Sequence, residues 1–234
     1  MQGLILAGGL GTRLRSIVSD RPKPMADVNG VPFLTFLIHK LVKASVNNIV
    51  LAVGYKSEVI ECYFGDGRNL DSSISYSIEK ELLGTGGAIA NAKKLLVEDE
   101  ILILNGDTFF DIDLKNMLEF HRGNKSPFTM ALRKVDDSSR YGSVEFDSSF
   151  KIKNFIEKGV KSNSSYINGG IYIINKEIIM AMKEDIAFSL EKETIPDLLK
   201  QDMLYAFLSD DYFIDIGIPE DYIKFCSDVK ERKL

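Results

Sequence analysis

A glycine-rich segment directly follows the first apolar run of the chain, and its residue types suit the binding of a phosphate. Residues 8–14 read GGLGTRL. Small residues let backbone N–H groups approach an anion closely, and the Arg13 guanidinium can clamp phosphate oxygens. Leu14 stands where a dinucleotide-binding loop needs its third glycine, and no Gly-Lys-Ser/Thr follows as in a Walker A loop. We therefore expect a different kind of phosphate clamp, with an ordinary glycine loop as the alternative.

A second cation, Lys23, lies between two prolines in the segment RPKP, residues 21–24. The prolines fix the backbone on both sides and favour extended geometry. A lysine on a stiff segment close to a phosphate loop is expected to act as a fixed cation. Taken alone, the segment could equally be an ordinary loop with a solvated lysine.

Two aspartates follow or interrupt apolar strands. Asp107 comes after the run EILILNG, and Asp215 lies within FIDIG. Ligands of open α/β sheets bind outside the carboxyl ends of the strands, and Mg²⁺ usually takes one or two carboxylates together with substrate phosphates. A charge among apolar neighbours also needs a partner. We expect these aspartates to form a Mg²⁺ site, although an Asn-Gly-Asp turn would explain Asp107 by itself.

Glu157 and Lys158 follow a strand-like run in FIEKG. With a sugar phosphate as second substrate, Lys158 could hold its phosphate and Glu157 its hydroxyls. A salt-bridged strand end is the alternative. Neither His39 nor His121 is paired in the sequence with a nucleophilic serine or cysteine, so acyl-transfer chemistry has no support.

The composition is that of a globular protein, with 234 residues, 45% hydrophobic residues, 27% charged residues and a net charge of −5. An acidic chain repels a phosphate backbone, which argues against nucleic-acid binding. Cys62 and Cys226 are expected to be reduced packing thiols. No apolar run is long enough for a signal peptide or a membrane span. We therefore expect a cytoplasmic protein with no membrane partner.

The alternation of apolar runs and helical patterns predicts an α/β domain with a mainly parallel mixed sheet between layers of helices. In the first half, strands are expected at 2–6, 48–54, 73–79 and 100–107. Helices are expected at 33–44, at 57–64 with Ser57 as N-cap, and at 85–96. The second half predicts strands at 143–146, 151–157, 166–174, 203–209 and 212–217, helices around 176–200, and a closing helix at 219–233.

Seven segments resemble, in family order, the sugar-1-phosphate nucleotidyltransferases: LAGGLGTRL, RPKPM, LGTGGAI, LNGDTFFDID, FIEK, NGGIYI and FIDIGIPEDY. The resemblance runs from residue 3 to about residue 225. It implies a three-layer α/β/α Rossmann-like fold and the transfer of a nucleotide to a sugar 1-phosphate with release of diphosphate. Three segments, SDRPKPM, EKELLGTGGAI and DDYFIDIGIPEDY, are most similar to members that use GTP and a heptose 1-phosphate to supply bacterial surface polysaccharides.

The resemblance implies a role for each matched residue. Nucleotide binding is assigned to Leu6, Ala7, Gly8, Gly9, Gly11, Thr12, Arg13, Lys23, Gly84 and Thr85. Sugar-phosphate binding is assigned to Asp107, Tyr141, Gly142, Glu157, Lys158, Asn168 and Gly169. The Mg²⁺ ligands would be Asp107 and Asp215, and the catalytic residues Arg13, Lys23, Asp107 and Lys158. One departure is Gly159, because several family members have proline at that position. The whole chain, 1–234, is expected to be one domain, with a nucleotide half at about 1–125 and a sugar-phosphate half at about 126–234.

The identity of the base is a separate inference. Guanine presents two adjacent donors, N1–H and N2–H₂, which the two oxygens of a carboxylate can match. Glu81 is the first candidate and Glu79 the second, although Glu81 could equally be a surface glutamate. The alternatives are a mannose 1-phosphate guanylyltransferase, a uridylyl-, cytidylyl- or thymidylyltransferase, and a non-catalytic paralogue. The sequence leaves open whether the chain forms a homo-oligomer.

Overall fold

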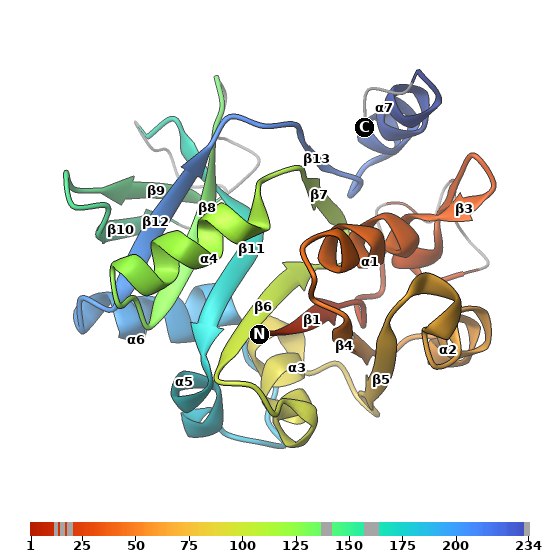
Figure 1. The fold of residues 1–234 in the computed structure, drawn as a ribbon, viewed down its shortest axis with the longest axis horizontal. Helices are drawn as coiled ribbons and strands as arrows, with labels where there is room; N and C mark the ends of the chain where they lie inside the picture. Colours follow the sequence, from red (N-terminus) through yellow and green to blue (C-terminus); the bar gives the residue numbers. More distant parts are fainter. Residues whose placement is uncertain (12–13, 15–16, 18–20, 137–141, 157–163, 232–234) are drawn as a thin grey trace.

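A computed structural model describes residues 1–11, 14, 17, 21–136, 142–156 and 164–231 of the chain (Figure 1). The central sheet has nine strands, and its main path runs in the order β10-β9-β11-β6-β1-β4-β5. Its amino-terminal half is parallel, because each strand is followed by a helix that returns the chain to the same edge. These four strands are β1 (Gln2–Leu6), β4 (Asn48–Val53), β5 (Ser73–Ile78) and β6 (Glu100–Asn105).

The second half of the sheet is mixed. β11 (Tyr166–Asn175) lies antiparallel to β6 on one side and to β8 (Phe128–Lys134) on the other. β12 (Leu204–Ser209) extends the sheet parallel to β8. The antiparallel pair β9 (Ser143–Phe146) and β10 (Ile152–Ile156) joins at the amino-terminal end of β11. β8 is a strand that the sequence patterns did not predict.

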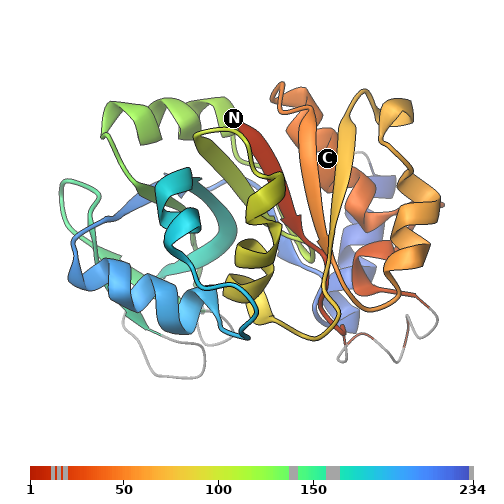
Figure 2. The ribbon, with the colours of Figure 1, turned by 90° about the horizontal axis from the view of Figure 1, so that it is seen from below.

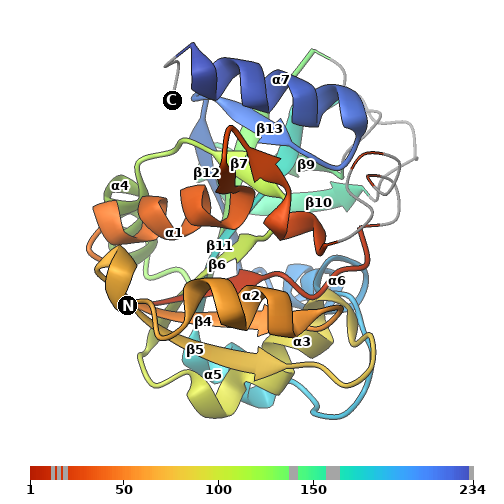
Figure 3. The ribbon, with the colours of Figure 1, turned by 90° about the vertical axis from the view of Figure 1, so that its right-hand side faces the viewer.

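Helices cover both faces of the sheet, so the expected α/β/α layering is confirmed (Figures 2 and 3). The two cores alternate along the strands: Ile5 faces one helical layer and Leu4 the other. The first layer holds α1 (Phe33–Lys43), α2 (Ser57–Phe64), α4 (Leu114–Gly123) and α7 (Pro219–Lys230). The second layer holds α3 (Gly84–Ala92), α5 (Lys176–Ala181) and α6 (Ile195–Lys200), with the π-helical turn Leu190–Thr194 leading into α6.

Two small two-stranded sheets accompany the main one. β2 (Asp27–Val28) and β3 (Val31–Pro32) form a hairpin beside α7, and β7 (Thr108–Phe110) pairs antiparallel with β13 (Phe213–Asp215). Figure 3 shows α7 lying along β13. The second pairing matters for the site, because it joins segments that are about a hundred residues apart in the chain.

Three local predictions need correction. Ser57 is not the N-cap of α2 but its first residue. The N-cap is Lys56, which has the left-handed φ of 52° and makes no side-chain cap. α3 ends at Ala92 and continues only as a 3₁₀ turn, Lys93–Leu95. The closing helix ends at Lys230.

Both cysteines are free and lie in helices: Cys62 is exposed in α2, and Cys226 is half-buried in α7. Within the described part of the chain, no helix combines the length and the apolar character that crossing a membrane requires.

Candidate active site

A cavity of about 460 Å³ opens at the carboxyl ends of β1 and β6. This is the edge where an open α/β sheet binds its ligand. The cavity brings together eight of the residues assigned to the nucleotide and one assigned to the metal: Leu6, Ala7, Gly8, Gly9, Gly11, Lys23, Gly84, Thr85 and Asp107. Thr12 and Arg13 lie outside the described residues.

The glycine loop needs its small residues because other groups lie against its backbone. A Cβ on Gly8 would come 2.4 Å from the Glu79 carboxylate, and one on Gly11 would come 2.7 Å from Lys23 Cβ. Gly11 also has a φ of +57°, which side chains rarely adopt. Leu14, which breaks the dinucleotide pattern, is 1% exposed in the core. Because glycine leaves room at these two positions, Glu79 and Lys23 can lie directly against the loop beside the cavity.

Lys23 joins the two predicted metal ligands. It begins the 3₁₀ turn Lys23–Met25 and is only 8% exposed. Its Nζ donates to Asp107 Oδ2 at 2.7 Å and lies 3.6 Å from Asp215 Oδ1. A buried ammonium is tolerable only with such partners. The three residues form one charged group, and Lys23 and Asp107 of this group line the cavity.

The pairing of β7 with β13 brings the two aspartates together. Asp215 is opposite Thr108, the residue after Asp107, and the Ile216 N–H donates to the Asp107 carbonyl at 2.9 Å. Asp215 Oδ1 also accepts from the Gly217 N–H at 2.7 Å. The side chain of Asp215 is thus oriented by the turn that follows it.

The donor set at this point fits Mg²⁺. In the residues that the structure describes, no three or more His, Cys, Asp or Glu side chains gather as a complete metal cage. Asp107 and Asp215, 38% and 23% exposed, supply two carboxylates beside a phosphate-type loop. Mg²⁺ is commonly held by one or two carboxylates, waters and substrate phosphates rather than by protein ligands alone.

Glu79 and Glu81 occupy different positions. Glu79 lines the cavity, and its Oε2 accepts from the Leu83 N–H at 3.1 Å. Burial raises the pKa of Glu79, and the hydrogen bond from Leu83 opposes that rise. Glu81 is exposed and is not among the described residues that line the cavity. The structure thus favours the second sequence candidate over the first as a group that could face a base.

Among the predicted sugar-phosphate residues that the structure describes, Asn168 and Gly169 lie on β11, Gly142 lies just before β9, and Asp107 follows β6. The Asn168 N–H donates to the Gly142 carbonyl at 3.0 Å, which places these two residues together. A Cβ on Gly169 would come 2.6 Å from the Phe110 ring, so only glycine fits there. Tyr141, Glu157 and Lys158 lie outside the described residues.

Three further residues line the cavity or bond to its wall, and they were not predicted from the sequence: Asn105, Tyr172 and Glu191. Glu191 accepts hydrogen bonds from Thr85 and Tyr172. Asn105 lines the cavity, and its Oδ1 is buried without a hydrogen-bond partner among the described residues. Asn105 and Tyr172 stand in the segments LNGDTFFDID and NGGIYI, which were the only signal for them, and Glu191 stands in no distinctive local pattern.

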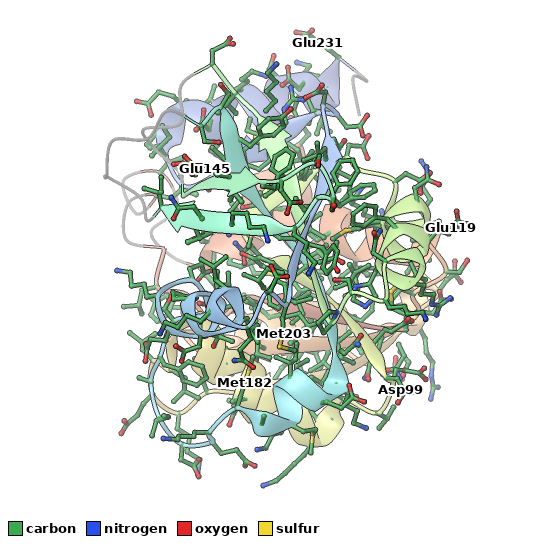
Figure 4. All side chains as sticks on the ribbon, turned by 90° about the vertical axis from the view of Figure 1, so that its left-hand side faces the viewer. Asp99, Glu119, Glu145, Met182, Met203 and Glu231 are labelled. Carbon is green, nitrogen blue, oxygen red and sulfur yellow. The ribbon has the colours of Figure 1, made fainter. Side chains whose placement is uncertain are left out.

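A second hollow of about 610 Å³ is lined mainly by residues of α5, of α6 and of the segment between them. Met182 and Met203 line it and lie close to each other in Figure 4. Phe188 also lines this hollow and packs behind Gly86 of α3. The hollow is therefore next to α3, whose residues Gly84, Thr85 and Ala88 line the first cavity.

Comparison of the sequence with known proteins gives matches over nearly the whole chain. The model of the family described as nucleotidyl transferase matches residues 2–232. A D-glycero-alpha-D-manno-heptose 1-phosphate guanylyltransferase of Campylobacter jejuni is 47% identical over 227 residues, covering 96% of this chain and 98% of that one. The protein of that name from Aneurinibacillus thermoaerophilus is 46% identical over 224 residues, covering 96% of both chains.

The crystal structure of HddC from Yersinia pseudotuberculosis complexed with GMP-PN is similar in three dimensions. It superposes with a TM-score of 0.85 at 39% identity and covers 97% of this chain and 99% of that one. A family match over nearly the whole chain, relatives at this identity and a cavity at the expected sheet edge agree with one another. The chain belongs to the nucleotidyl transferase family.

Proposed function

We propose that the protein transfers GMP from GTP to D-glycero-α-D-manno-heptose 1-phosphate, giving GDP-heptose and diphosphate. The observation that carries the proposal is the Lys23–Asp107–Asp215 group, which lies beside the cavity that the glycine loop lines. The names of the two relatives support GTP and the heptose as substrates. The product would supply bacterial surface polysaccharide synthesis in the cytoplasm.

The reaction is an in-line displacement at the α-phosphorus of GTP. An oxygen of the sugar phosphate attacks, and diphosphate leaves on the opposite side. The nucleophile is already an anion, so no residue has to remove a proton. The barrier comes mainly from bringing two anions together in the correct orientation, which makes catalysis electrostatic and geometric.

Lys23 would neutralise charge on the α-phosphate and the leaving diphosphate, which its position beside the glycine loop supports. Asp107 and Asp215 would hold Mg²⁺, which when bound offsets the negative charge of the triphosphate. Arg13 is proposed as a second clamp on the nucleotide phosphates, and Lys158 as the group that holds the incoming phosphate.

Glu79 is proposed as the reader of guanine. Its carboxylate lies in the cavity wall, and its two oxygens can accept from the N1–H and N2–H₂ groups of the base. Uracil offers only one donor at that edge. The hydrogen bond from Leu83 keeps the carboxylate in place before the nucleotide arrives. Glu81 is not proposed for this role, because it is exposed outside the cavity.

The sugar phosphate would occupy the side of the cavity towards β11. Asn168 and Gly169 lie on β11, next to the residues that line the cavity rather than among them, and the Asn168 N–H donates to the Gly142 carbonyl. We propose that these three residues form this part of the site together with Tyr141, Glu157 and Lys158. The nucleotide half of the chain would then be about 1–125 and the sugar-phosphate half about 126–234. This division agrees with the change from parallel to mixed sheet between β6 and β11.

A diphosphate-release assay tests the proposal. Four nucleoside triphosphates are each combined with Mg²⁺ and a small panel of sugar 1-phosphates. We expect the highest kcat/KM for GTP with the heptose 1-phosphate. A higher value with mannose 1-phosphate would reassign the sugar, and a higher value with another triphosphate would reassign the base. No release with any pair would indicate a non-catalytic paralogue.

A further inference from the structure

A chain of partly buried hydrogen bonds connects the cavity wall with the strand that carries Asn168 and Gly169. Its centre is Glu191 in the π-helical turn Leu190–Thr194. Glu191 Oε2 accepts from the Thr85 hydroxyl at 2.6 Å and from the Ser189 hydroxyl at 2.9 Å. Glu191 Oε1 accepts from the Tyr172 hydroxyl at 3.4 Å. The two oxygens of one carboxylate therefore face two different parts of the site.

On the sugar-phosphate side the chain continues from Tyr172 to Asn168. The Tyr172 hydroxyl accepts from Asn168 Nδ2 at 2.7 Å, and Asn168 Oδ1 accepts from the Gly170 N–H at 3.0 Å. Tyr172 is fully buried, and burial raises its pKa well above the ordinary value, so the phenol keeps its proton. Because Asn168 occupies the acceptor side of the hydroxyl, that proton points to Glu191. The direction of every donor in the chain is thereby fixed.

On the nucleotide side the chain ends at Thr85, whose hydroxyl also accepts from the Leu190 N–H at 2.9 Å. The same segment is bound to the start of α3 through Phe188. The Phe188 N–H donates to the Leu83 carbonyl at 2.9 Å, and the Gly86 N–H donates to the Phe188 carbonyl at 3.1 Å. Thr85 lines the cavity, so its hydroxyl holds the wall in place through bonds inside the protein.

We propose that Glu191 is a positioning residue that couples the two substrate sites, so that binding of the sugar phosphate strengthens binding of the nucleotide. A ligand at Asn168 orders the side chain that donates to Tyr172, and Tyr172 and Thr85 share the carboxylate of Glu191. Ordering one end of a continuous network lowers the cost of ordering the other end. The coupling rests on the proposed function, because that proposal assigns Asn168 to one substrate and Thr85 to the other.

Tyr172→Phe is the most direct test. The residue is 0% exposed and cannot touch either substrate, and its ring contact with Phe128 is retained. The dissociation constant of α,β-methylene GTP is measured by calorimetry with and without saturating heptose 1-phosphate. We expect the sugar phosphate to tighten nucleotide binding about tenfold in the wild type. In the variant we expect this ratio to fall below about twofold while each ligand alone binds nearly as before.

Two further variants separate coupling from general damage. Tyr166→Phe, on the same strand but with its ring against Phe146, should keep the wild-type ratio. Glu191→Gln replaces one acceptor oxygen by a donor, so it should lower the ratio like Tyr172→Phe. Because both break the same chain, the double variant should lower it no further than either single change.

The outcomes are distinguishable. A wild-type ratio retained by Tyr172→Phe, additive effects of the two changes, or a wild type that binds both ligands without cooperativity would overturn the coupling while leaving the proposed function intact. A wild-type protein that does not bind the heptose phosphate at all would overturn the proposed function and the coupling together.

Discussion

The ammonium of Lys23 lies 2.7 Å from a carboxylate oxygen of Asp107 and is shared with Asp215 at 3.6 Å. A cation of the protein therefore stands between the two carboxylates that are proposed to hold the metal. In the absence of substrate this ion pair satisfies both aspartates, because a partly buried carboxylate without a partner is costly. Metal and lysine are then expected to compete for the same oxygens until a triphosphate offers the lysine new partners.

This competition predicts the effect of Lys23→Met on metal binding. The variant keeps an unbranched apolar chain but removes the ammonium, so Mn²⁺ should bind more tightly than to the wild type in the absence of nucleotide. Electron paramagnetic resonance of free Mn²⁺ measures this without turnover. Lys94→Met, at an exposed lysine paired with Glu184, is the matched control and should not change the affinity. Equal or weaker Mn²⁺ binding by Lys23→Met would contradict the competition.

The same substitution should affect catalysis differently from binding. Loss of one fixed cation at the reacting phosphate lowers kcat by about 10²–10³-fold, by analogy with the loss of an oxyanion-hole donor. The affinity for GTP should change much less, because other groups of the loop still hold the nucleotide. Steady-state kinetics and nucleotide calorimetry on one preparation give both values. An unchanged kcat at saturating substrates would rule out the role of Lys23.

Glu79→Gln should reduce the preference for GTP over UTP. The amide has one acceptor instead of two, so one of the two guanine donors loses its partner. A good bidentate contact is worth about 1–3 kcal/mol of discrimination, which corresponds to a loss of about fivefold to 150-fold in the ratio of kcat/KM. Glu81→Gln is the control from the same segment and should leave the ratio unchanged. The opposite result, with Glu81→Gln alone lowering the ratio, would restore Glu81 as the reader.

The raised pKa of Glu79 also predicts a dependence on pH. As the pH falls through this pKa, the carboxyl takes up a proton and loses an acceptor for guanine. We therefore expect the KM for GTP to rise on acidification at a higher pH than an ordinary glutamate would give, and Glu79→Gln should lack this rise. A wild-type KM that follows the same pH course as that of the variant would contradict the assignment.

Acidification should stabilise the folded protein, although it weakens the proposed binding of GTP. Because the folded pKa lies above the unfolded value of about 4.5, the folded state holds a proton that the unfolded state releases between the two values. The stability that this proton confers is present below pH 4.5 and is lost as the pH rises through the folded pKa. Thermal unfolding is measured from pH 4 to pH 8. The wild type should lose stability relative to Glu79→Gln as the pH rises from about 4.5 through the folded pKa of Glu79.

Several elements of the fold could be predicted from the sequence because they depend on local pattern. The parallel strands β1, β4 and β6 were predicted nearly to the residue, because strands buried on both faces are short, continuous apolar runs. The edge strand β5 is only partly buried, and its bounds were also predicted closely. The glycine loop and Lys23 were also identified, since special backbone geometry needs glycine and proline. These features are specified by neighbours along the chain.

Contacts between segments that are distant in the chain could not be predicted from the sequence. Asp107 meets Asp215 because β7 pairs with β13, and no local pattern predicts that pairing. Glu79 rather than Glu81 faces the cavity because its N–H donates to the Val53 carbonyl at 2.7 Å and its carboxylate lies against Gly8 of the glycine loop. Glu191 looked like one charge among several in SLEKET until the fold placed Thr85 and Tyr172 against its two oxygens. Each of these contacts joins residues whose approach is set by packing of the whole domain, and that information is not contained in any short stretch of sequence.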